Sequence, residues 1–441
     1  MSRPVGVGLL GLGTIGTGVV KVLQQNAAVI EQRLGFPVRL VRIADLDLET
    51  DRGVDLSGVT FDDDSAGLLA DPAVDIVVEL IGGYGVAREL TLAAIAAGKH
   101  VVTANKALLA LHGKEIFAAA KAKNVDVGFE ASVGGGIPIL RSLREGLAAN
   151  HVESLYGIMN GTTNYVLTEM EKTGEDFEVV LKRAQDLGYA EADPTFDVDG
   201  IDAAHKLTLL VAMAFGAELT FKDIPTEGIR NLTPMDFEAA AEFGYRIKLL
   251  GVAKSRRGAD GTERIEARVQ PTMIPRESLL ANVDGAMNAI AVQGDAVGPT
   301  LYYGAGAGEL PTASAVVGDL IEIARGVAGG GAGRVPPLSY FAEHIVEKPE
   351  VPAGDVFTRC YLVFTVDERP GVLAQITSVL SENGISIESV IQKRSEEGRP
   401  VPILMLTHPA AEASIRGALD EIDRLDEVTA PTRLVRIEEE L

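Results

Sequence analysis

The chain has 441 residues, of which 46% are hydrophobic, and a formal net charge of −23 at pH 7. Its length exceeds one ordinary hydrophobic core, so roughly two to four domains are expected. The acidic balance argues against nucleic acid or an anionic membrane as a partner, and the single cysteine, Cys360, excludes an internal disulfide framework and a cysteine zinc cluster.

The N-terminal apolar run has a composition unlike that of a secretory signal. Glycines recur throughout MSRPVGVGLLGLG, which removes the helical character of a signal peptide. No uninterrupted run of about 18 apolar residues indicates a membrane span. A cytoplasmic protein is therefore expected.

A glycine-rich turn follows the first predicted strand. Val5–Leu10 is an apolar run typical of a buried strand, and Gly11-Leu12-Gly13-Thr14-Ile15-Gly16 follows it directly, before a helical periodicity begins. Gly11 permits the tight turn, Gly13 lets the backbone approach a pyrophosphate, and Gly16 allows the helix to pack closely on the strand. Because the motif stands between a strand and a helix, it indicates a Rossmann-type dinucleotide-binding unit.

The second predicted strand carries the residues that bear on the choice between NAD and NADP. Val38–Ala44 ends at Asp45, whose carboxylate suits the adenosine ribose hydroxyls and favours NAD. Asp45 lies further along than the usual spacing, and Arg42 nearby suits a 2′-phosphate. The sequence leaves the cofactor preference open.

Further strand–helix alternation predicts a parallel sheet. Asp75–Ile81 is a strand, Glu89–Ala97 a helix, and His100–Thr103 a strand that leads into Ala104-Asn105-Lys106. The carboxyl ends of parallel strands form the ligand crevice of such a sheet. Lys106 therefore stands where a cofactor or substrate binds.

A predicted helix from about Val198 to Phe215 carries two charges among apolar residues. Asp202 and Lys206 lie one turn apart on the same face, and the rest of the helix is apolar on nearly all sides. Burying charge is costly unless the groups are paired or used. An ordinary helix salt bridge is the plainer interpretation, and the rest of the chain favours a functional one.

The middle of the chain predicts mixed α+β structure. His151–Asn160 and Val252–Val269 suggest sheet, Glu238–Leu250 suggests a helix, and a further helix is expected from Thr312 to Ala328. A Gly- and Pro-rich linker follows, and the last part of the chain reads as a βαββαβ unit.

Up to about residue 330, the chain resembles the homoserine dehydrogenase family. The motifs that carry the resemblance occur in the family's order: GLGTIG, VVTANKALLA, FEASVGGGIPIL, NGTTNYVL, LGYAEADPTFDVDGIDAAHKL and YYGAGAGELPTASAVVGDL. The resemblance implies NAD(P)-dependent interconversion of L-aspartate 4-semialdehyde and L-homoserine, within threonine, methionine and isoleucine synthesis.

The resemblance also implies a role for individual residues. Lys206 would donate the proton to the aldehyde oxygen, Lys106 would lie between nicotinamide and substrate, and Glu191 and Asp202 would contact the substrate. The cofactor would contact Gly11, Gly13, Thr14, Ile15, Gly16, Asp45, Thr103, Lys106, Gly306 and Gly308. A monovalent cation, Na⁺ or K⁺, would bind Glu130 and the backbone carbonyls of Val133, Gly135 and Ile137.

The chemistry of an aldehyde reduction agrees with these roles. Negative charge develops on the oxygen, so a protonated donor must be poised at that atom. The carboxylate of Asp202 keeps a neighbouring Lys206 charged. The carboxylates of Glu191 and Asp202 have the right sign to hold the substrate ammonium.

The C-terminal unit resembles an ACT domain, a module that binds amino acids. DERPGVLAQI and ENGISI carry this resemblance, and it implies a threonine effector held at Asp367–Gly371. A purely oligomerising module is the alternative. A homodimer or homotetramer is expected.

The expected fold class is α/β, with five segments along the chain. They are a Rossmann-like doubly wound domain (1–136), an α+β catalytic and dimerisation domain (137–310), a helix returning to the nucleotide domain (311–331), a linker (332–354) and the ACT domain (355–441). Two other functions remain open at this point. One is a sensing protein that has lost its chemistry, against which Lys106, Lys206, Glu191 and Asp202 speak. The other is 3-phosphoglycerate dehydrogenase, which the chain resembles poorly.

Overall fold

A computed structural model describes residues 3–218, 224–258, 260–331, 333–392 and 400–440 of the chain. The chain divides into two compact units. Unit 1 comprises Met1–Gly161, Asp202–Ile224 and Met287–Lys348, and unit 2 comprises Thr162–Ile201, Pro225–Ala286 and Pro349–Leu441. Among the described residues, no helix has the length and apolar character needed to cross a membrane.

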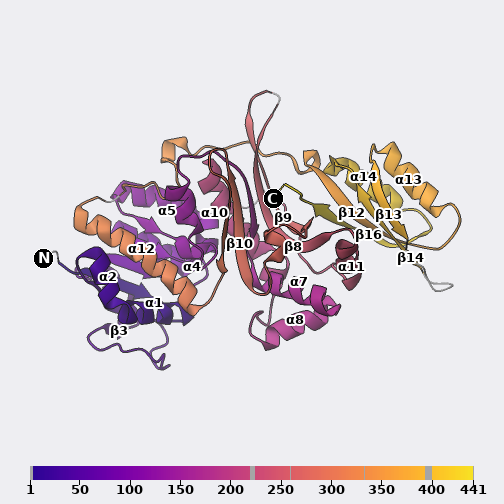
Figure 1. The fold of residues 1–441 in the computed structure, drawn as a ribbon. Helices are drawn as coiled ribbons and strands as arrows, with labels where there is room; N and C mark the ends of the chain where they lie inside the picture. Colours follow the sequence, from indigo (N-terminus) through magenta and orange to yellow (C-terminus); the bar gives the residue numbers. More distant parts are fainter. Residues whose placement is uncertain (1–2, 219–223, 259, 332, 393–399, 441) are drawn as a thin grey trace. The chain divides into compact units, whose positions relative to one another are not determined.

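Unit 1 is built on a six-stranded parallel sheet of strand order β3-β2-β1-β4-β5-β6. Figure 1 draws the segment that contains these strands in indigo and purple. The strands are β1 (Val5–Leu10), β2 (Val38–Ala44), β3 (Thr60–Asp62), β4 (Ile76–Glu79), β5 (His100–Thr103) and β6 (Val127–Gly128). The expected doubly wound fold is confirmed. Strands β1 and β4 are buried along their whole length and show no polar alternation, because helices cover both faces of the sheet.

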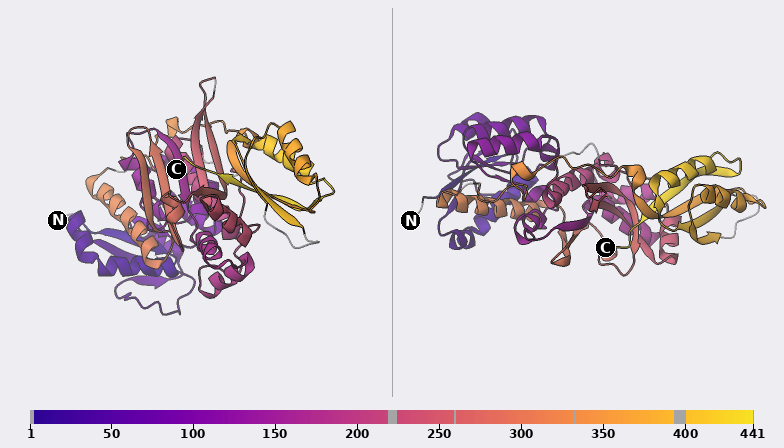
Figure 2. Two further views of the ribbon diagram at one scale, coloured as in Figure 1. Left: turned by 45° about the vertical axis from the view of Figure 1, so that its right-hand side comes forward. Right: turned by 90° about the horizontal axis from the view of Figure 1, so that it is seen from above.

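Helices pack on the two faces of this sheet (Figure 2). They are α1 (Thr14–Gln25), α2 (Ala27–Leu34), α3 (Ser65–Ala70), α4 (Gly85–Ala96), α5 (Lys106–Lys123) and α12 (Glu309–Gly329). Helices α1 and α12 pack together over one face, where Val20 and Leu320 join Leu9 and Val78 of the sheet in one fully buried cluster. Helix α12 thus brings a late part of the chain onto the parallel sheet.

The rest of unit 1 includes a buried helix. It contains β7 (Val152–Ile158), β10 (Met287–Gly294), β11 (Gly298–Ala305), α6 (Ile139–Arg141), a π-helical turn (Ser142–Gly146) and α10 (Ile201–Phe215), whose first residue belongs to unit 2. Strand β10 pairs antiparallel with β7 and β11. Helix α10 is buried from Asp202 to Leu210, which agrees with its apolar sequence.

Unit 2 contains a helical part and a long hairpin. Its elements are α7 (Gly161–Thr173), which starts in unit 1, α8 (Phe177–Asp186), α9 (Thr195–Val198), α11 (Pro234–Glu242), β8 (Tyr245–Arg257) and β9 (Glu263–Pro275). The prediction of a helix over Glu238–Leu250 is wrong beyond residue 242. Gly244 has φ +85° and ends the helical path, and β8 is so fully buried that its apolar run shows no alternation.

The C-terminal part of unit 2 has the predicted βαββαβ order. It consists of β12 (Phe357–Val366), α13 (Val372–Glu382), β13 (Ile387–Gln392), β14 (Val401–Thr407), a short β15 (Ala410–Ala411), α14 (Glu412–Ile422) and β16 (Val428–Ile437). The strands pair antiparallel in the order β16-β12-β14-β13. One apolar cluster lies between this sheet and its two helices, with Phe364, Ile376 and Ile415 fully buried.

Strand β16 also joins this sheet to the long hairpin. Arg436 and Ile437 pair in parallel with Thr272 and Met273 of β9. Directly after β16, Glu438 is 4% exposed and accepts hydrogen bonds from Lys254 at 2.7 Å and from Arg268. Removing either the carboxylate or its basic partner from such a buried ion pair leaves an uncompensated charge. The C-terminal strand is therefore part of the core of unit 2.

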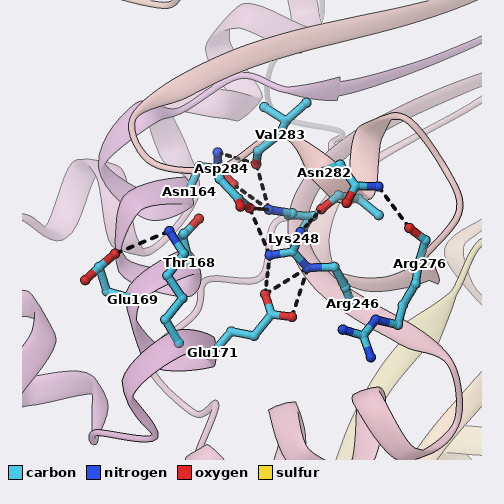
Figure 3. A network of polar contacts seen from close by, with 12 residues as sticks. Asn164, Thr168, Glu169, Glu171, Arg246, Lys248, Arg276, Asn282, Val283 and Asp284 are labelled. Carbon is cyan, nitrogen blue, oxygen red and sulfur yellow. Dashed lines mark hydrogen bonds and ion pairs between the residues drawn. The ribbon is translucent and has the colours of Figure 1, made fainter.

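A second buried network holds α7 against β8 (Figure 3). The Lys248 ammonium donates to the Val283 carbonyl at 2.7 Å and to Asn164 Oδ1 at 3.3 Å. Arg246 donates to Glu171 and, at 2.8 Å, to Asp284. Burial lowers the pKa of Lys248 to about 8, with Arg246 acting in the same direction. These charges are paired, so they fix the register of β8 against α7.

Candidate active site

Two lysines from distant parts of unit 1 converge on one buried carboxylate. Lys206 Nζ lies 2.7 Å from Asp202 Oδ2, and Lys106 Nζ lies 3.0 Å from Asp202 Oδ1. Asp202 Oδ2 also accepts from Asn160 Nδ2 at 2.9 Å, and Lys206 donates to the Met159 carbonyl at 2.6 Å. Each oxygen of Asp202 thus has a lysine, and the group carries a net positive charge.

Local structure fixes each member of this group. Lys206 stands one turn after Asp202 in α10, and the Asp202 and Lys206 side chains are 6% and 10% exposed. Lys106 is the first residue of α5, and the side chain of Asn105 caps that helix by accepting from Leu108 N at 3.0 Å. The Lys106 side chain is 32% exposed, so it lies on the open side of the group.

The electrostatics of the group favour the ionised pair. Burial alone would raise the pKa of Asp202, but the ammonium groups of Lys206 and Lys106 hold it well below its usual range. Burial lowers the pKa of the neighbouring His205, which disfavours its charged form.

The glycine loop has the geometry that a dinucleotide needs. Gly11 has φ +94°, and a Cβ there would lie 2.8 Å from the Leu80 carbonyl oxygen. A Cβ at Gly16 would lie 2.2 Å from the Gly11 carbonyl oxygen. Gly13 caps α1 and faces open space, with no atom of the described chain within 4 Å of a Cβ. The N-terminus of α1 is accessible to a phosphate there. Thr14 and Ile15 begin that helix.

The residues predicted to choose between NAD and NADP already have protein partners. Asp45 accepts hydrogen bonds from the backbone N–H groups of Leu12 and Asp47. Arg42 forms ion pairs with Asp62 at 2.7 Å and Asp64 at 3.1 Å. Asp45 thus supports the glycine loop through Leu12.

Arg52 also lies against the glycine loop, although no sequence motif indicates it. Its Nε donates to the Leu12 carbonyl at 2.8 Å, and its Nη2 lies 3.1 Å from Asp47. Its side chain is 12% exposed. No periodic pattern marks this arginine, because it stands in an irregular segment after β2.

The candidate cation site lies in the turn after β6. Glu130 is 6% exposed, and its carboxylate accepts from Leu140 N at 2.9 Å and Arg141 N at 2.8 Å. The backbone N–H of Glu130 donates to Asp319 Oδ2 at 2.8 Å. Burial, and then the Asp319 carboxylate, raises the pKa of Glu130 to about 7. Two neighbouring buried carboxylates form an environment that fits a cation.

The same turn contacts the predicted late glycines. A Cβ at Gly135 would lie 2.5 Å from the Gly306 carbonyl oxygen, and Gly136 N donates to the Ala305 carbonyl at 2.9 Å. Gly308, with φ +126°, caps α12. The next residue, Glu309, pairs with Lys21 of α1 at 2.6 Å. The loop before α12 is thus held between the turn that contains Gly135 and the helix that follows the glycine loop.

The remaining predicted residues lie in other places. Thr103 ends β5 and donates to the buried Glu79 at 2.7 Å. Glu191 belongs to unit 2, in an exposed position between α8 and α9, where its carbonyl accepts from Gln185 at 3.1 Å. Its part in the site stays a prediction.

Comparison with known proteins gives a consistent result over the whole chain. The family model for homoserine dehydrogenase matches residues 138–321, and the model for its NAD-binding domain matches residues 11–130. The homoserine dehydrogenase of Pseudomonas aeruginosa is 49% identical over 438 residues, which cover 99% of each chain. The chain belongs to the homoserine dehydrogenase family. The ACT domain model matches residues 361–427, which confirms the predicted C-terminal module.

Solved structures of this family have the same fold. A homoserine dehydrogenase from Thiobacillus denitrificans is 51% identical, with a TM-score of 0.93 over 99% of each chain. The homoserine dehydrogenase of S. aureus is 31% identical, with a TM-score of 0.76 over 99% of this chain and 100% of that one. Membership of this homoserine dehydrogenase family makes the chain an NAD(P)-dependent oxidoreductase with the predicted α/β fold.

Proposed function

We propose that the chain interconverts L-aspartate 4-semialdehyde and L-homoserine, with Lys206 as the proton donor and acceptor at the reacting oxygen. The observation that carries this proposal is the buried group of Lys206, Asp202 and Lys106 on two helices of unit 1. NAD(P)H, when bound, supplies the hydride. All that the protein must add at the carbonyl is orientation, exclusion of water and a proton.

Lys206 suits this task because its ammonium is held in place. Its bonds to Asp202 and to the Met159 carbonyl fix Nζ and favour the charged form. As hydride reaches the aldehyde carbon, the oxygen becomes negative and takes a proton from Nζ. In the reverse direction Nζ accepts that proton, so homoserine oxidation should be faster in alkaline buffer.

Asp202 orients both lysines in this proposal. Because each of its oxygens already has a lysine, its main contribution is to hold the two ammonium groups at a fixed separation. Lys106, the more exposed lysine, would face the nicotinamide and the substrate. Glu191 would then hold the substrate ammonium, and Asp202 would contact the substrate through the lysines.

The cofactor would bind over the glycine loop. Gly11, Gly13, Thr14, Ile15 and Gly16 would hold the pyrophosphate at the N-terminus of α1. Asp45 and Thr103 would line the same edge of the sheet, beside Lys106 and the loop that contains Gly306 and Gly308. Open space at Gly13 supports this arrangement.

Absorbance of the reduced nicotinamide tests the proposal directly. Purified protein with homoserine should reduce NAD or NADP, and the ratio of the two rates gives the cofactor preference. The assay uses alkaline buffer with sodium and potassium present. No homoserine-dependent reduction with either cofactor would contradict the proposal and favour a sensing protein without chemistry.

We also propose that Glu130 and the carbonyls of Val133, Gly135 and Ile137 hold Na⁺ or K⁺. Oxygen ligands are those that such cations prefer, and the buried carboxylate of Asp319 adjoins Glu130. A cation there would stiffen the turn that connects the nucleotide-binding sheet to the following helices. It has no role in the hydride or proton steps.

Salt exchange tests this cation site. At equal ionic strength, replacing tetramethylammonium chloride with NaCl or KCl should raise the thermal midpoint by about 2 °C or more. Glu130→Gln should abolish this difference, whereas Glu145→Gln, an exposed change in the same segment, should preserve it. An equal response to salt in both variants would exclude Glu130 as a ligand.

We further propose that threonine regulates the enzyme through the ACT domain. The segment 367–371 leads into α13, whose N-terminal N–H groups can hold a carboxylate. Gly371 has φ +101° and faces open space at this helix end. Deletion of the domain would be a poor test, because it would remove β16 from β9 and leave Lys254 and Arg268 without Glu438.

Point substitution gives a sharper test of regulation. Gly371→Val should abolish the effect of threonine on the rate and leave the rate without threonine nearly unchanged. Gly384→Val is the matched control, since it strains a left-handed glycine at the other end of α13. Threonine inhibition that survives Gly371→Val, or that Gly384→Val removes equally, would exclude this end of the helix as the effector site.

A homodimer or homotetramer is also proposed. Strand β11 is the outermost strand of its sheet, and its exposed residues include Leu301 and Tyr303. Light scattering should therefore give a mass of two or four times 46.5 kDa. A mass of 46.5 kDa at micromolar concentration would contradict this assignment.

A further inference from the structure

Unit 1 contains a large cavity at the β6 edge of its parallel sheet. The cavity has a volume of about 870 Å³ and lies against β6, the C-terminal halves of α5 and α12, and residues 333–345. Lys106 and Gly308 lie at the opposite ends of these two helices. The volume is in the range of small-molecule pockets. Neither the proposed reaction nor the ACT domain uses it.

The walls of the cavity are mainly apolar. Phe117 of α5, Ile323 of α12 and Leu338 of the following segment line it, and they are 9%, 5% and 5% exposed. Val125, just before β6, and Phe341 extend the same surface. An aromatic or branched hydrocarbon group would be desolvated between these side chains.

The polar end of the cavity contains one arginine with hydrogen-bonding capacity to spare. The Arg144 side chain is 10% exposed and forms an ion pair with Glu145 at 3.2 Å. Its Nε is buried without a hydrogen-bond partner among the described residues. A guanidinium group has five N–H donors in a planar fork that matches a carboxylate.

The carboxylates beside Arg144 have other partners. Asp126 accepts from Gly333 N at 2.7 Å. Asp319 accepts from Glu130 N at 2.8 Å and lies 3.4 Å from Arg141. Both carboxylates attract the charge of Arg144, but their hydrogen bonds go to other groups, so N–H donors of the guanidinium can still bind a further carboxylate.

We infer that this cavity is a second small-molecule site, which takes a carboxylate with an aromatic or branched apolar body. The carboxylate binds Arg144, and the apolar body packs between Phe117, Ile323 and Leu338. This site is separate from the glycine loop and from the Lys206 group, so its ligand binds together with cofactor and substrate. The inference does not depend on the proposed reaction.

Three matched probes test the inference on the full chain by titration calorimetry. They are 3-phenylpropionate, 3-phenylpropanol and 3-phenylpropylamine, which share one apolar body and differ in charge. The acid should bind with a Kd of roughly 0.1–1 mM, and the alcohol and amine at least about tenfold more weakly. Saturating NAD(P) alone, and in a separate titration saturating homoserine alone, should leave the Kd of the acid unchanged.

Two substitutions locate the binding. Arg144→Met should raise the Kd of the acid about tenfold and leave the Kd of the alcohol unchanged. Ala118→Trp, at an exposed position of α5 on the cavity wall, should abolish binding of all three probes. Arg33→Met, on α2 and outside the lining of the cavity, is the matched control and should change nothing. Thermal midpoints of the variants verify that each one is folded.

Several results would overturn the inference. They are no binding of the acid up to about 10 mM, equal affinity for acid and amine, displacement of the acid by cofactor or substrate, or unchanged affinity in folded Arg144→Met. Because none of these readouts requires turnover, an enzyme inactive toward homoserine would still test the cavity.

Discussion

Replacing Lys206 with methionine should lower turnover by about a thousandfold and leave cofactor affinity nearly unchanged. Methionine has a similar length and is apolar, so it fills the space of the buried lysine stem. It cannot donate a proton to the developing alkoxide. The glycine loop lies on other elements of unit 1, and no step of cofactor binding needs Lys206 Nζ.

Separate measurements of binding and chemistry make this prediction specific. Single-turnover reduction of NAD(P) with saturating homoserine reports the chemical step, and fluorescence titration reports cofactor affinity. Lys123→Met, an exposed lysine at the end of α5, is the control and should retain wild-type rates. Wild-type turnover in Lys206→Met, or an equal loss in Lys123→Met, would remove the proposed role.

The sequence predicts the nucleotide-binding part well because each signal has a local cause. The glycine turn stands directly between β1 and α1, so the prediction of each of these three elements supports the prediction of the other two. The βαββαβ order of the C-terminal part follows from short elements separated by turn residues. The pair Asp202 and Lys206 is also local, since both belong to one helix.

The parts that the sequence could not predict depend on contacts between distant residues. Lys106 reaches Asp202 across 96 positions. The strand pattern placed Lys106 at the ligand crevice but did not predict that Asp202 would be its partner. Asp45 accepts a hydrogen bond from Leu12, so a residue expected to bind ribose also supports the loop. Arg52 and Lys248 lie in segments without a diagnostic period, and their partners are known only once the chain is folded.

The same distinction explains the error at β8. A helix and a strand buried on both faces have equally apolar sequences, so periodicity cannot separate them. The length of the segment and its helix-breaking residues separate the two alternatives. Here α11 ends at Glu242, and Gly244, two residues later, prevents the helix from continuing. The long pairing of β8 with β9 then stabilises the extended form.

Asp202→Asn should reduce both stability and turnover, for one electrostatic reason. Asp202 supplies the negative charge of two ion pairs, one with Lys106 and one with Lys206. With asparagine in its place, the two ammonium groups face each other with no anion between them. Breaking such a buried pair costs about 3–5 kcal/mol. Turnover should fall by about a hundredfold or more, because Lys206 loses its orientation.

The pH dependence of the stability loss has a defined sign. Since the pKa of Asp202 is lowered in the folded state, its contribution is present above the ordinary aspartate pKa, near 4, and is lost as pH falls below it. Urea unfolding should therefore give a constant difference between wild type and Asp202→Asn from about pH 5 to 8. Asp199→Asn, on an exposed aspartate that precedes α10, is the control and should show almost no loss.

A double substitution separates the structural role of Asp202 from its chemical one. Asp202→Asn combined with Lys206→Met removes one anion and one cation, so it should recover part of the stability that Asp202→Asn loses. Turnover should remain as low as in Lys206→Met alone, because the proton donor is absent. If the double variant were no more stable than Asp202→Asn, charge imbalance would not be the cause of the loss. If it were more active than Lys206→Met, another group would be supplying the proton.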